Sequence, residues 1–231
     1  MGPQRLLAGG WLLSAVACGD SPRTGPATAS EPSPARAEDG KGASAEPGIL
    51  ALRPLPKVPD AVDAKGPDAW GWRDRNGENV VVVTYAEREG TDGADDPTTS
   101  RSMVLTHDAI AADGTVVRKR TVKDFVNDCP FDVHLGLESG SLQTSDLDSD
   151  GVAELTFAYR LSCASDVSPM DRKVLLLEDG EKYILRGHTG VNLGSEVVPS
   201  EYDVDPSVNR APPAFREHLV AAWGGTAPKY P

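Results

Sequence analysis

From residue 69 onward, hydrophobic and polar residues alternate in short runs with the period of β-strands. The runs are rich in β-branched and aromatic residues, and four polar segments between them contain Asn-Gly or Asp-Gly. These dipeptides adopt positive φ readily and are typical of β-hairpin turns. The pattern therefore predicts eight strands in four consecutive hairpins. The paired runs are 69–73 with 79–87, 102–111 with 115–123, 140–145 with 152–161, and 173–178 with 182–188.

The fold class that follows is mainly β, with one C-terminal helix. A sandwich, a strongly twisted sheet and a partly closed barrel all satisfy the strand pattern. Prolines at 212 and 213 suit the first turn of a helix, and a Gly-Gly pair at 224–225 ends it. We expect this helix to cover a face or an edge of the sheet. The apolar residues on its predicted buried side are Phe215, Leu219, Val220 and Trp223.

The N-terminal segment has the pattern of a secretory signal. A basic start at 1–5 precedes twelve nearly unbroken apolar residues at 6–17, and small residues stand directly before Cys18. A helix needs about 20 residues to cross a hydrocarbon core, so this run predicts a signal peptide over 1–17 and not a membrane-spanning segment.

Cysteine parity bears on how that signal is processed. Small residues before a cut suit the ordinary secretory peptidase, whereas small-small-Cys is similar to the bacterial lipoprotein box, although Ala15 stands where that box usually has Leu. Lipid on Cys18 leaves Cys129 and Cys163 as an even pair for a disulfide in an oxidising compartment. Free thiols and metal ligands are the alternatives for that pair. Parity favours a lipoprotein anchored to a membrane of the bacterial cell envelope.

Composition divides the rest of the chain into a tether and a domain. Residues 18–48 are rich in Pro, Ala, Ser, Gly and charge and contain no aromatic residue, so they cannot offset the entropy of ordering. We expect a single β-rich domain over 49–231, recognisable over 70–190. Its first part, 49–65, contains prolines that exclude a regular helix and should lie extended on the domain edge.

The charge balance excludes one class of partner. The 231 residues include 23 Lys and Arg against 35 Asp and Glu, which gives a net charge of -12. Such a chain repels the phosphates of nucleic acid. The hydrophobic fraction of 39% is large enough for a core, so disorder throughout is also excluded.

One loop has clear chemical content. Residues 146–154, DLDSDGVAE, place carboxylates at loop positions 1, 3, 5 and 9, glycine at 6 and a backbone carbonyl at 7. Flexible loops with hard oxygen ligands at this spacing suit Ca2+, whereas Mg2+ prefers a rigid octahedral shell. The predicted ligands of a structural calcium ion are Asp146, Asp148, Asp150, the Val152 carbonyl and Glu154.

The loop differs from an EF-hand, because Phe157 occupies position 12 and a strand follows in place of a helix. It resembles the calcium hairpins of FG-GAP and VCBS-type extracellular β repeats, in which a DxDxDGxxD/E loop joins two strands. The alternative is an acidic loop held by Asx turns without a metal. We favour calcium because the three aspartates repel one another with no evident compensating cation.

Short motifs follow one another in order across residues 70–190, among them WRDRNGEN at 72–79, DFVNDC at 124–129, the loop at 146–154 and DVSP at 166–169. Together they resemble a little-studied family of exported bacterial proteins labelled as surface polysaccharide biosynthesis proteins. The resemblance implies an envelope-located β domain that shares the disulfide and the acidic loop, and it implies no established active site.

Two classes of function remain open. The first is a non-catalytic domain that binds or organises an envelope glycan or protein. The second is an envelope glycan hydrolase or transferase that uses carboxylates or the loop ion. The sequence contains no GxSxG elbow, phosphate-binding GKS/T loop or GxGxxG turn, which favours the first class. Trp70 and Trp72 share a strand face and suit either a sugar-stacking platform or, as we expect, core packing.

Overall fold

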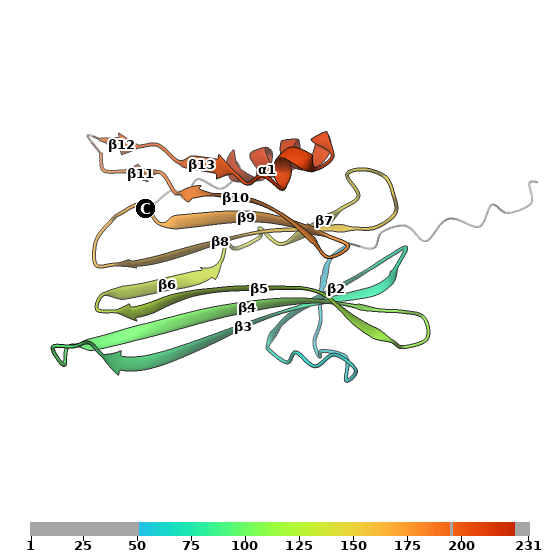
Figure 1. Ribbon diagram of the computed structural model, residues 1–231, viewed down its shortest axis with the longest axis horizontal. Coiled ribbons are helices and arrows are strands. Elements are labelled where there is room, and N and C mark those ends of the chain that lie inside the picture. The colour runs from blue at the N-terminus through green and yellow to red at the C-terminus, as the bar shows by residue number, and fades with distance from the viewer. Residues whose placement is uncertain (1–50, 195, 225–231) are drawn as a thin grey trace, which may run out of the picture. The chain divides into compact units, whose positions relative to one another are not determined.

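A computed structural model of the chain describes residues 51–194 and 196–224, whose strands form three antiparallel sheets (Figure 1). Sheet A holds, in chain order, β1 (Arg53–Pro54), β2 (Asp68–Asp74), β3 (Gly77–Thr91), β4 (Pro97–Ile110) and β5 (Val116–Cys129). Sheet B has the order β13 (Glu201–Val204), β10 (Glu181–His188), β9 (Asp171–Glu178), β8 (Glu154–Ala164) and β6 (Asp132–Leu137), and β7 (Gln143–Ser145) also pairs with β8. Sheet C contains only β11 (Val191–Asn192) and β12 (Val197–Val198).

The mainly β class with one C-terminal helix is confirmed, and the sheets of the described residues form no closed barrel. Three predicted hairpins are present as β2–β3, β4–β5 and β9–β10. The first turn needs glycine, since Gly77 has a φ of 118° and a Cβ there would lie 2.6 Å from the Ile110 carbonyl oxygen.

The third predicted hairpin is incomplete. Its first strand, β7, has three residues, and the longer antiparallel partner of β8 is β6, which the sequence pattern missed. Only Pro130 and Phe131 separate β5 from β6, and no hairpin dipeptide marks this connection. Because proline donates no hydrogen bond to a ladder, Pro130 suits the point where the chain leaves sheet A for sheet B.

Sheets A and B face each other across the largest apolar cluster. Inward-facing residues alternate along the strands of both sheets, as expected where one face of each sheet is buried. Trp72 is fully buried in this cluster, and half-buried Trp70 packs against it, in agreement with core packing. The fully buried members include Trp72, Val81, Met103 and Leu105 from sheet A and Leu155, Phe157, Leu175 and Leu177 from sheet B.

The outer faces of both sheets are covered as well. The helix α1 (Pro213–Gly224), which follows the 3-10 helix η1 (Val208–Arg210), buries Phe215, Leu219 and Trp223 against sheet B. Val220, predicted on the buried side, is 38% exposed. On sheet A, β1 extends the edge beside β2, and Val58 and Val62 then pack against the outer face. This segment therefore covers a face as well as the expected edge.

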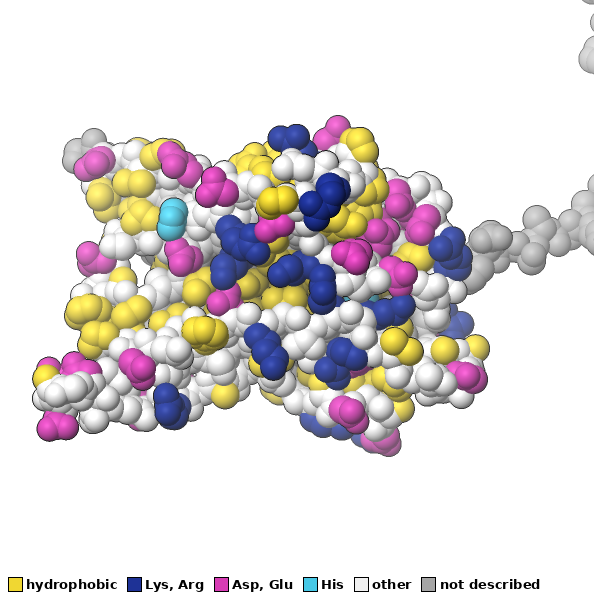
Figure 2. All heavy atoms as spheres, in the orientation of Figure 1, with side chains coloured by type: hydrophobic (Ala, Val, Ile, Leu, Met, Phe, Trp, Pro, Cys, Tyr) yellow, Lys and Arg dark blue, Asp and Glu magenta, His cyan; other side chains and the backbone are white. Residues whose placement is uncertain are grey.

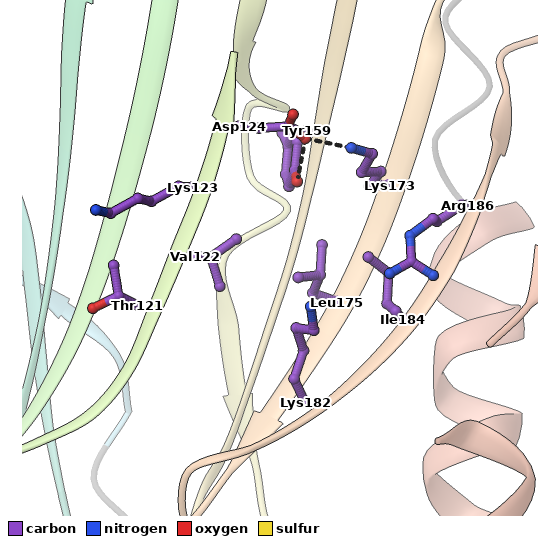
Figure 3. A pocket seen from close by; sticks show the side chains of 10 residues that line it. All are labelled: Thr121, Val122, Lys123, Asp124, Tyr159, Lys173, Leu175, Lys182, Ile184 and Arg186. Carbon is purple, nitrogen blue, oxygen red and sulfur yellow. Dashed lines mark hydrogen bonds and ion pairs between the residues drawn. The ribbon is translucent and has the colours of Figure 1, made fainter. Parts of the chain in front are cut away.

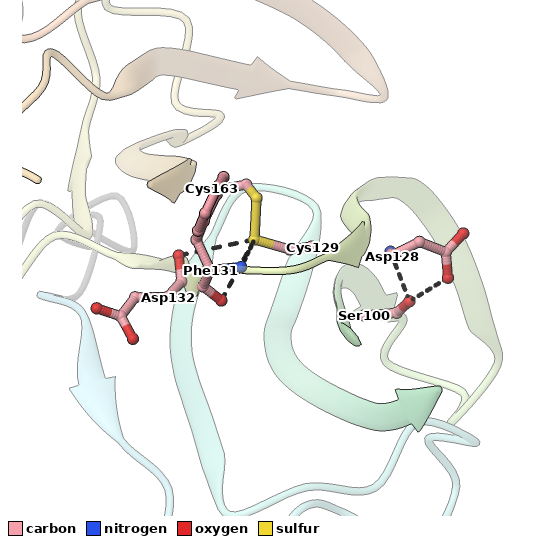
Figure 4. Close-up of a disulfide and its surroundings, with 6 residues drawn as sticks. All are labelled: Ser100, Asp128, Cys129, Phe131, Asp132 and Cys163. Atoms are coloured by element: carbon pink, nitrogen blue, oxygen red, sulfur yellow. Dashed lines mark hydrogen bonds between the residues drawn. A yellow bond between two sulfur atoms is a disulfide. The ribbon is translucent and has the colours of Figure 1, made fainter. Parts of the chain in front are cut away.

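The predicted disulfide joins the two sheets. Cys129 ends β5 and Cys163 lies in β8, and their sulfur atoms are 1.98 Å apart (Figure 4). The free-thiol and metal-ligand alternatives are thereby excluded. Beside the bond, the backbone N–H of Asp128 donates to the Ser100 hydroxyl over 2.9 Å. The covalent link therefore lies where the chain crosses from sheet A to sheet B.

We expect the double substitution Cys129→Ser and Cys163→Ser to lower the free energy of unfolding by about 4 kcal/mol. The cysteines are 34 residues apart, and on the chain-entropy model a loop of this length stabilises by that amount. Urea unfolding of both proteins measures the difference, with Cys18→Ser as a control. A loss below about 1 kcal/mol would contradict a stabilising role for the bond.

A buried histidine links core packing to pH. His107 on β4 is 4% exposed, and its Nε2 lies 3.0 Å from Asn79 Oδ1. Its Nδ1 has no hydrogen-bond partner among the described residues. Burial lowers the pKa of His107 to about 4, although the carboxylates of Asp74 and Asp108 act in the opposite direction. The imidazole is therefore neutral in the folded protein near neutral pH.

We expect the free energy of unfolding to fall as the pH falls from about 6.5 to 4, since unfolded His107 then binds a proton that the folded state excludes. His107→Gln keeps a hydrogen-bonding side chain and removes this titration. The wild-type curve should lose up to about 3 kcal/mol more than the variant over this range, as followed by urea unfolding. Parallel curves would contradict the prediction.

Candidate functional site: an acidic loop and a basic groove

The acidic loop connects β7 to β8 and turns at Gly151, whose φ is 82°. Asp146, Asp148 and Asp150 are exposed, whereas Val152 is buried. The carboxylates therefore lie at the surface of a loop whose exit is fixed in the core.

The loop carboxylates come together in two adjacent groups. Ligand oxygens of Asp146, Asp148 and Glu154 lie within 4.8 Å of one another, and so do those of Asp148, Asp150 and Glu178. Asp148 belongs to both groups. The sequence analysis missed Glu178, which reaches the loop because β9 pairs with β8. Its position at a strand end, before the Asp179-Gly180 turn, was the available signal.

Burial and neighbouring charges raise the pKa values of two of these carboxyl groups, Glu178 and Glu154. Burial, followed by the charges of Asp148, Glu154 and Asp150, raises the pKa of Glu178 to about 7. Burial also raises the pKa of Glu154, although hydrogen bonds from the Leu147 N–H and the Ser145 hydroxyl oppose the shift. A divalent cation with oxygen ligands would neutralise such a cluster, so these carboxylates could hold a metal ion.

The protein supplies part of this neutralisation itself. The Arg75 guanidinium lies 3.3 Å from Asp150 Oδ2 and also donates to the Asp150 carbonyl. The expectation that the aspartates lack a compensating cation is therefore wrong at Asp150. Arg75 was missed because it lies in the β2–β3 turn, far from the loop in the sequence.

Features of the metal-free alternative are present too. The Val152 N–H donates to Asp150 Oδ1 over 2.7 Å, and the Asp150 N–H donates to Asp148 Oδ1 over 3.2 Å. These are Asx-type bonds. An ionised carboxylate has about four acceptor sites, so such bonds leave capacity for a cation. The Val152 carbonyl remains a predicted ligand.

The loop is bonded to sheet A. The Arg75 N–H donates to the Gly151 carbonyl over 2.8 Å, and the Ala153 N–H donates to Asp74 Oδ2 over 3.1 Å. Asp74 is 4% exposed and also lies 3.4 Å from the Trp72 indole nitrogen. The acidic loop therefore links sheet B to the β2–β3 turn of sheet A.

A second candidate site, which the sequence analysis missed, is a groove between β5 and the inner face of sheet B. Its cavity measures about 430 Å³. Figure 2 shows one side of the molecule, with Lys and Arg side chains gathered along the middle of the view. We call this cavity the basic groove. Its lining residues are Thr121, Val122, Lys123, Asp124, Tyr159, Lys173, Leu175, Lys182, Ile184 and Arg186.

Figure 3 shows how these side chains lie. Lys123 points to the other side of β5, whereas Asp124, Tyr159 and Lys173 meet at one end of the groove. The Tyr159 hydroxyl donates to Asp124 Oδ2 over 2.8 Å, and the Lys173 ammonium group is paired with the same oxygen. Burial, together with the Asp124 charge, raises the pKa of Tyr159, so this hydroxyl stays protonated. One oxygen of the Asp124 carboxylate therefore holds both groups.

The features predicted for the N-terminal region lie outside the described residues. They are the signal peptide over 1–17, the lipidated Cys18 and the tether over 18–48. In the part of the chain that the structure describes, no helix has the length and apolar character needed to cross a membrane.

Comparisons with known proteins found no matching family model, curated protein or solved structure. The resemblance to exported surface polysaccharide proteins therefore remains a prediction, and the groove and the loop must be interpreted from their own chemistry.

We expect calcium to raise the melting temperature through the acidic loop. With a Kd of about 0.1 to 1 mM, about 10 mM CaCl2 should raise Tm by roughly 3 to 8 °C relative to EDTA. Asp148→Asn should abolish most of this shift, because Asp148 belongs to both carboxylate groups. Asp95→Asn, an exposed aspartate in the β3–β4 turn, is the matched control. An equal calcium shift in both variants, or none in the wild type, would contradict the site.

Proposed function

We propose that the protein is an exported bacterial lipoprotein whose β domain binds or organises a surface polysaccharide at the cell envelope without catalysing a reaction. The basic groove is the observation that carries this proposal. A cavity of about 430 Å³ is in the size range of ligand sites. Its lining joins four segments of two sheets around polar groups that converge on one space.

The lining of the groove favours binding over glycan hydrolysis. A glycosidase needs two carboxyl groups, roughly 5 to 10 Å apart, on opposite sides of a glycosidic bond. Asp124 is the one carboxylate among the residues that line the groove, and Tyr159 and Lys173 already hold it. The carboxylates of the acidic loop do not line this cavity.

We assign calcium a structural role in this proposal. The ion would bind Asp146, Asp148, Asp150, the Val152 carbonyl and Glu154, with Glu178 as a further candidate ligand. Neutralising these groups would strengthen the link between the loop and sheet A. Separation from the groove supports a scaffold role and not one as a Lewis acid.

The location at the envelope rests on two supports. The first is the secretory pattern before Cys18. The second is the Cys129–Cys163 disulfide, which forms and persists in oxidising compartments such as the bacterial periplasm. Lipid on Cys18 would then hold the domain at a membrane, since several acyl chains together give stable anchoring.

Deleting the protein and restoring it from a plasmid tests this proposal. We expect deletion to change the amount or the chain length of surface polysaccharide, measured by electrophoresis of surface glycans. Wild type and Ser21→Ala, a matched substitution three residues after Cys18, should restore the profile and partition with membranes. Cys18→Ser should move to the soluble fraction and restore little. An unchanged profile on deletion, or membrane-bound Cys18→Ser, would contradict the proposal.

A further inference from the structure

We propose that the basic groove binds an anionic saccharide, a sugar that carries a carboxylate or a phosphate group, and this inference rests on the glycan-binding role proposed above. The groove has unbalanced positive charge, one of its lysines takes part in no ion pair among the described residues, and apolar groups lie beside its cations.

The ladder between β9 and β10 places like charges opposite each other. Lys173 pairs in register with Arg186, and such directly opposed cations destabilise a sheet. Asp124 pairs with Lys173, and Asp205 lies 2.6 Å from the Arg186 guanidinium. Among the residues that line the groove, Lys173, Lys182 and Arg186 face the single carboxylate of Asp124. Asp205 does not line this cavity, and Asp203, which is in register with Arg186 on β13, lines the neighbouring one, so the groove itself has an excess of positive charge.

Lys182 is the cation with the least compensation. It takes part in no ion pair among the described residues. On the ladder it is paired in register with Leu177 of β9, next to the pair formed by Ile184 and Leu175 on the same face of the sheet. Burial lowers the pKa of Lys182, and the charges of Arg186, Arg120 and Lys173 add to the shift, whereas Asp205 opposes it. Figure 3 shows its side chain extending along the groove beside Leu175. An oxyanion in the groove would supply the missing partner.

The neighbouring Arg120 strengthens the case. Its Nε is buried and has no hydrogen-bond partner within the described residues. A buried polar group without a partner is costly, and a bound ligand is one way in which it is satisfied. Arg120 and Val122 alternate with Thr121 along β5, and Val122 faces the core between the sheets. Arg120 therefore belongs to the face of β5 that is turned toward sheet B, where it does not line the cavity but adds positive charge near Lys182.

The rest of the cavity favours a sugar over a simple ion. Lys173 and Arg186 also line a second cavity of about 230 Å³, where the carboxylates of Asp171 and Asp203 lie. The carboxylates of the second cavity can accept hydrogen bonds from sugar hydroxyl groups. The excess positive charge, by contrast, lies in the larger cavity, the basic groove. Leu175 and Ile184 provide an apolar surface for the C–H groups of a ring. One extended saccharide would thus contact cations with its anionic group and carboxylates with its hydroxyls.

The setting of the groove makes it selective. The whole chain has a net charge of -12, so the surrounding surface repels the closely spaced phosphates of nucleic acid. A cleft in which cations outnumber carboxylates has a positive local potential and attracts an anionic group that is small enough to enter. Recognition should therefore weaken as ionic strength rises.

Isothermal titration of the soluble Cys18→Ser chain tests the inference with three probes. Trigalacturonic acid carries carboxylates, maltotriose is a neutral match of the same length, and inorganic phosphate provides the anion without the sugar. We expect trigalacturonic acid to bind at least about tenfold more tightly than maltotriose. Lys182→Met should weaken that binding by about tenfold, and Lys182→Arg should restore most of it. Lys57→Met, which removes an exposed lysine remote from the groove, should leave it unchanged.

The outcomes separate the two proposals. Phosphate that binds or competes with the same dependence on Lys182 supports the inference and assigns the anion to a phosphate-bearing sugar. Equal binding of maltotriose that is insensitive to Lys182→Met overturns the inference and leaves glycan binding standing. Absence of binding by all three probes overturns the inference. The proposed function is then tested separately by the deletion experiment. Arg186→Met provides a second groove variant if Lys182→Met does not fold, with folding checked by melting temperature.

Discussion

Burial of apolar side chains between sheets A and B holds this domain together, and the placement of both candidate sites depends on it. Trp72 from one sheet and Phe157 from the other are fully buried in the same cluster. The disulfide closes this interface where the chain crosses between the sheets, and the acidic loop bonds to sheet A through Arg75 and Asp74. Where β5 ends sheet A, part of the inner face of sheet B remains uncovered and forms the groove.

Local signals predicted the parts of the fold that local chemistry determines. Turn dipeptides identified three hairpins because positive φ is a property of the residues at the turn itself. Cysteine parity identified the disulfide, and the alternating aspartates identified the loop. The pairing of β6 with β8 was missed because a strand's partner depends on the whole sheet, and no turn dipeptide precedes β6.

The remaining site residues were missed for the same reason. Glu178 and Arg75 meet the acidic loop only because β9 pairs with β8 and the β2–β3 turn packs beside it. The groove combines residues near 122, 173 and 184, which no sequence spacing connects. Val220 was predicted to be buried, because helical periodicity places it beside Leu219 and Trp223. It is exposed, because it lies outside the face of α1 that packs against sheet B.

Hydrogen exchange of individual backbone amides, with calcium and with EDTA, tests most directly whether the acidic loop is a cation-dependent link between the sheets. The Arg75 and Ala153 amides make the bonds that join loop and sheet A. The account predicts that calcium slows exchange at both amides, while amides in the β4–β5 ladder, remote from the loop, change little. Equal exchange at Arg75 and Ala153 in the two conditions, despite saturating calcium, would contradict it.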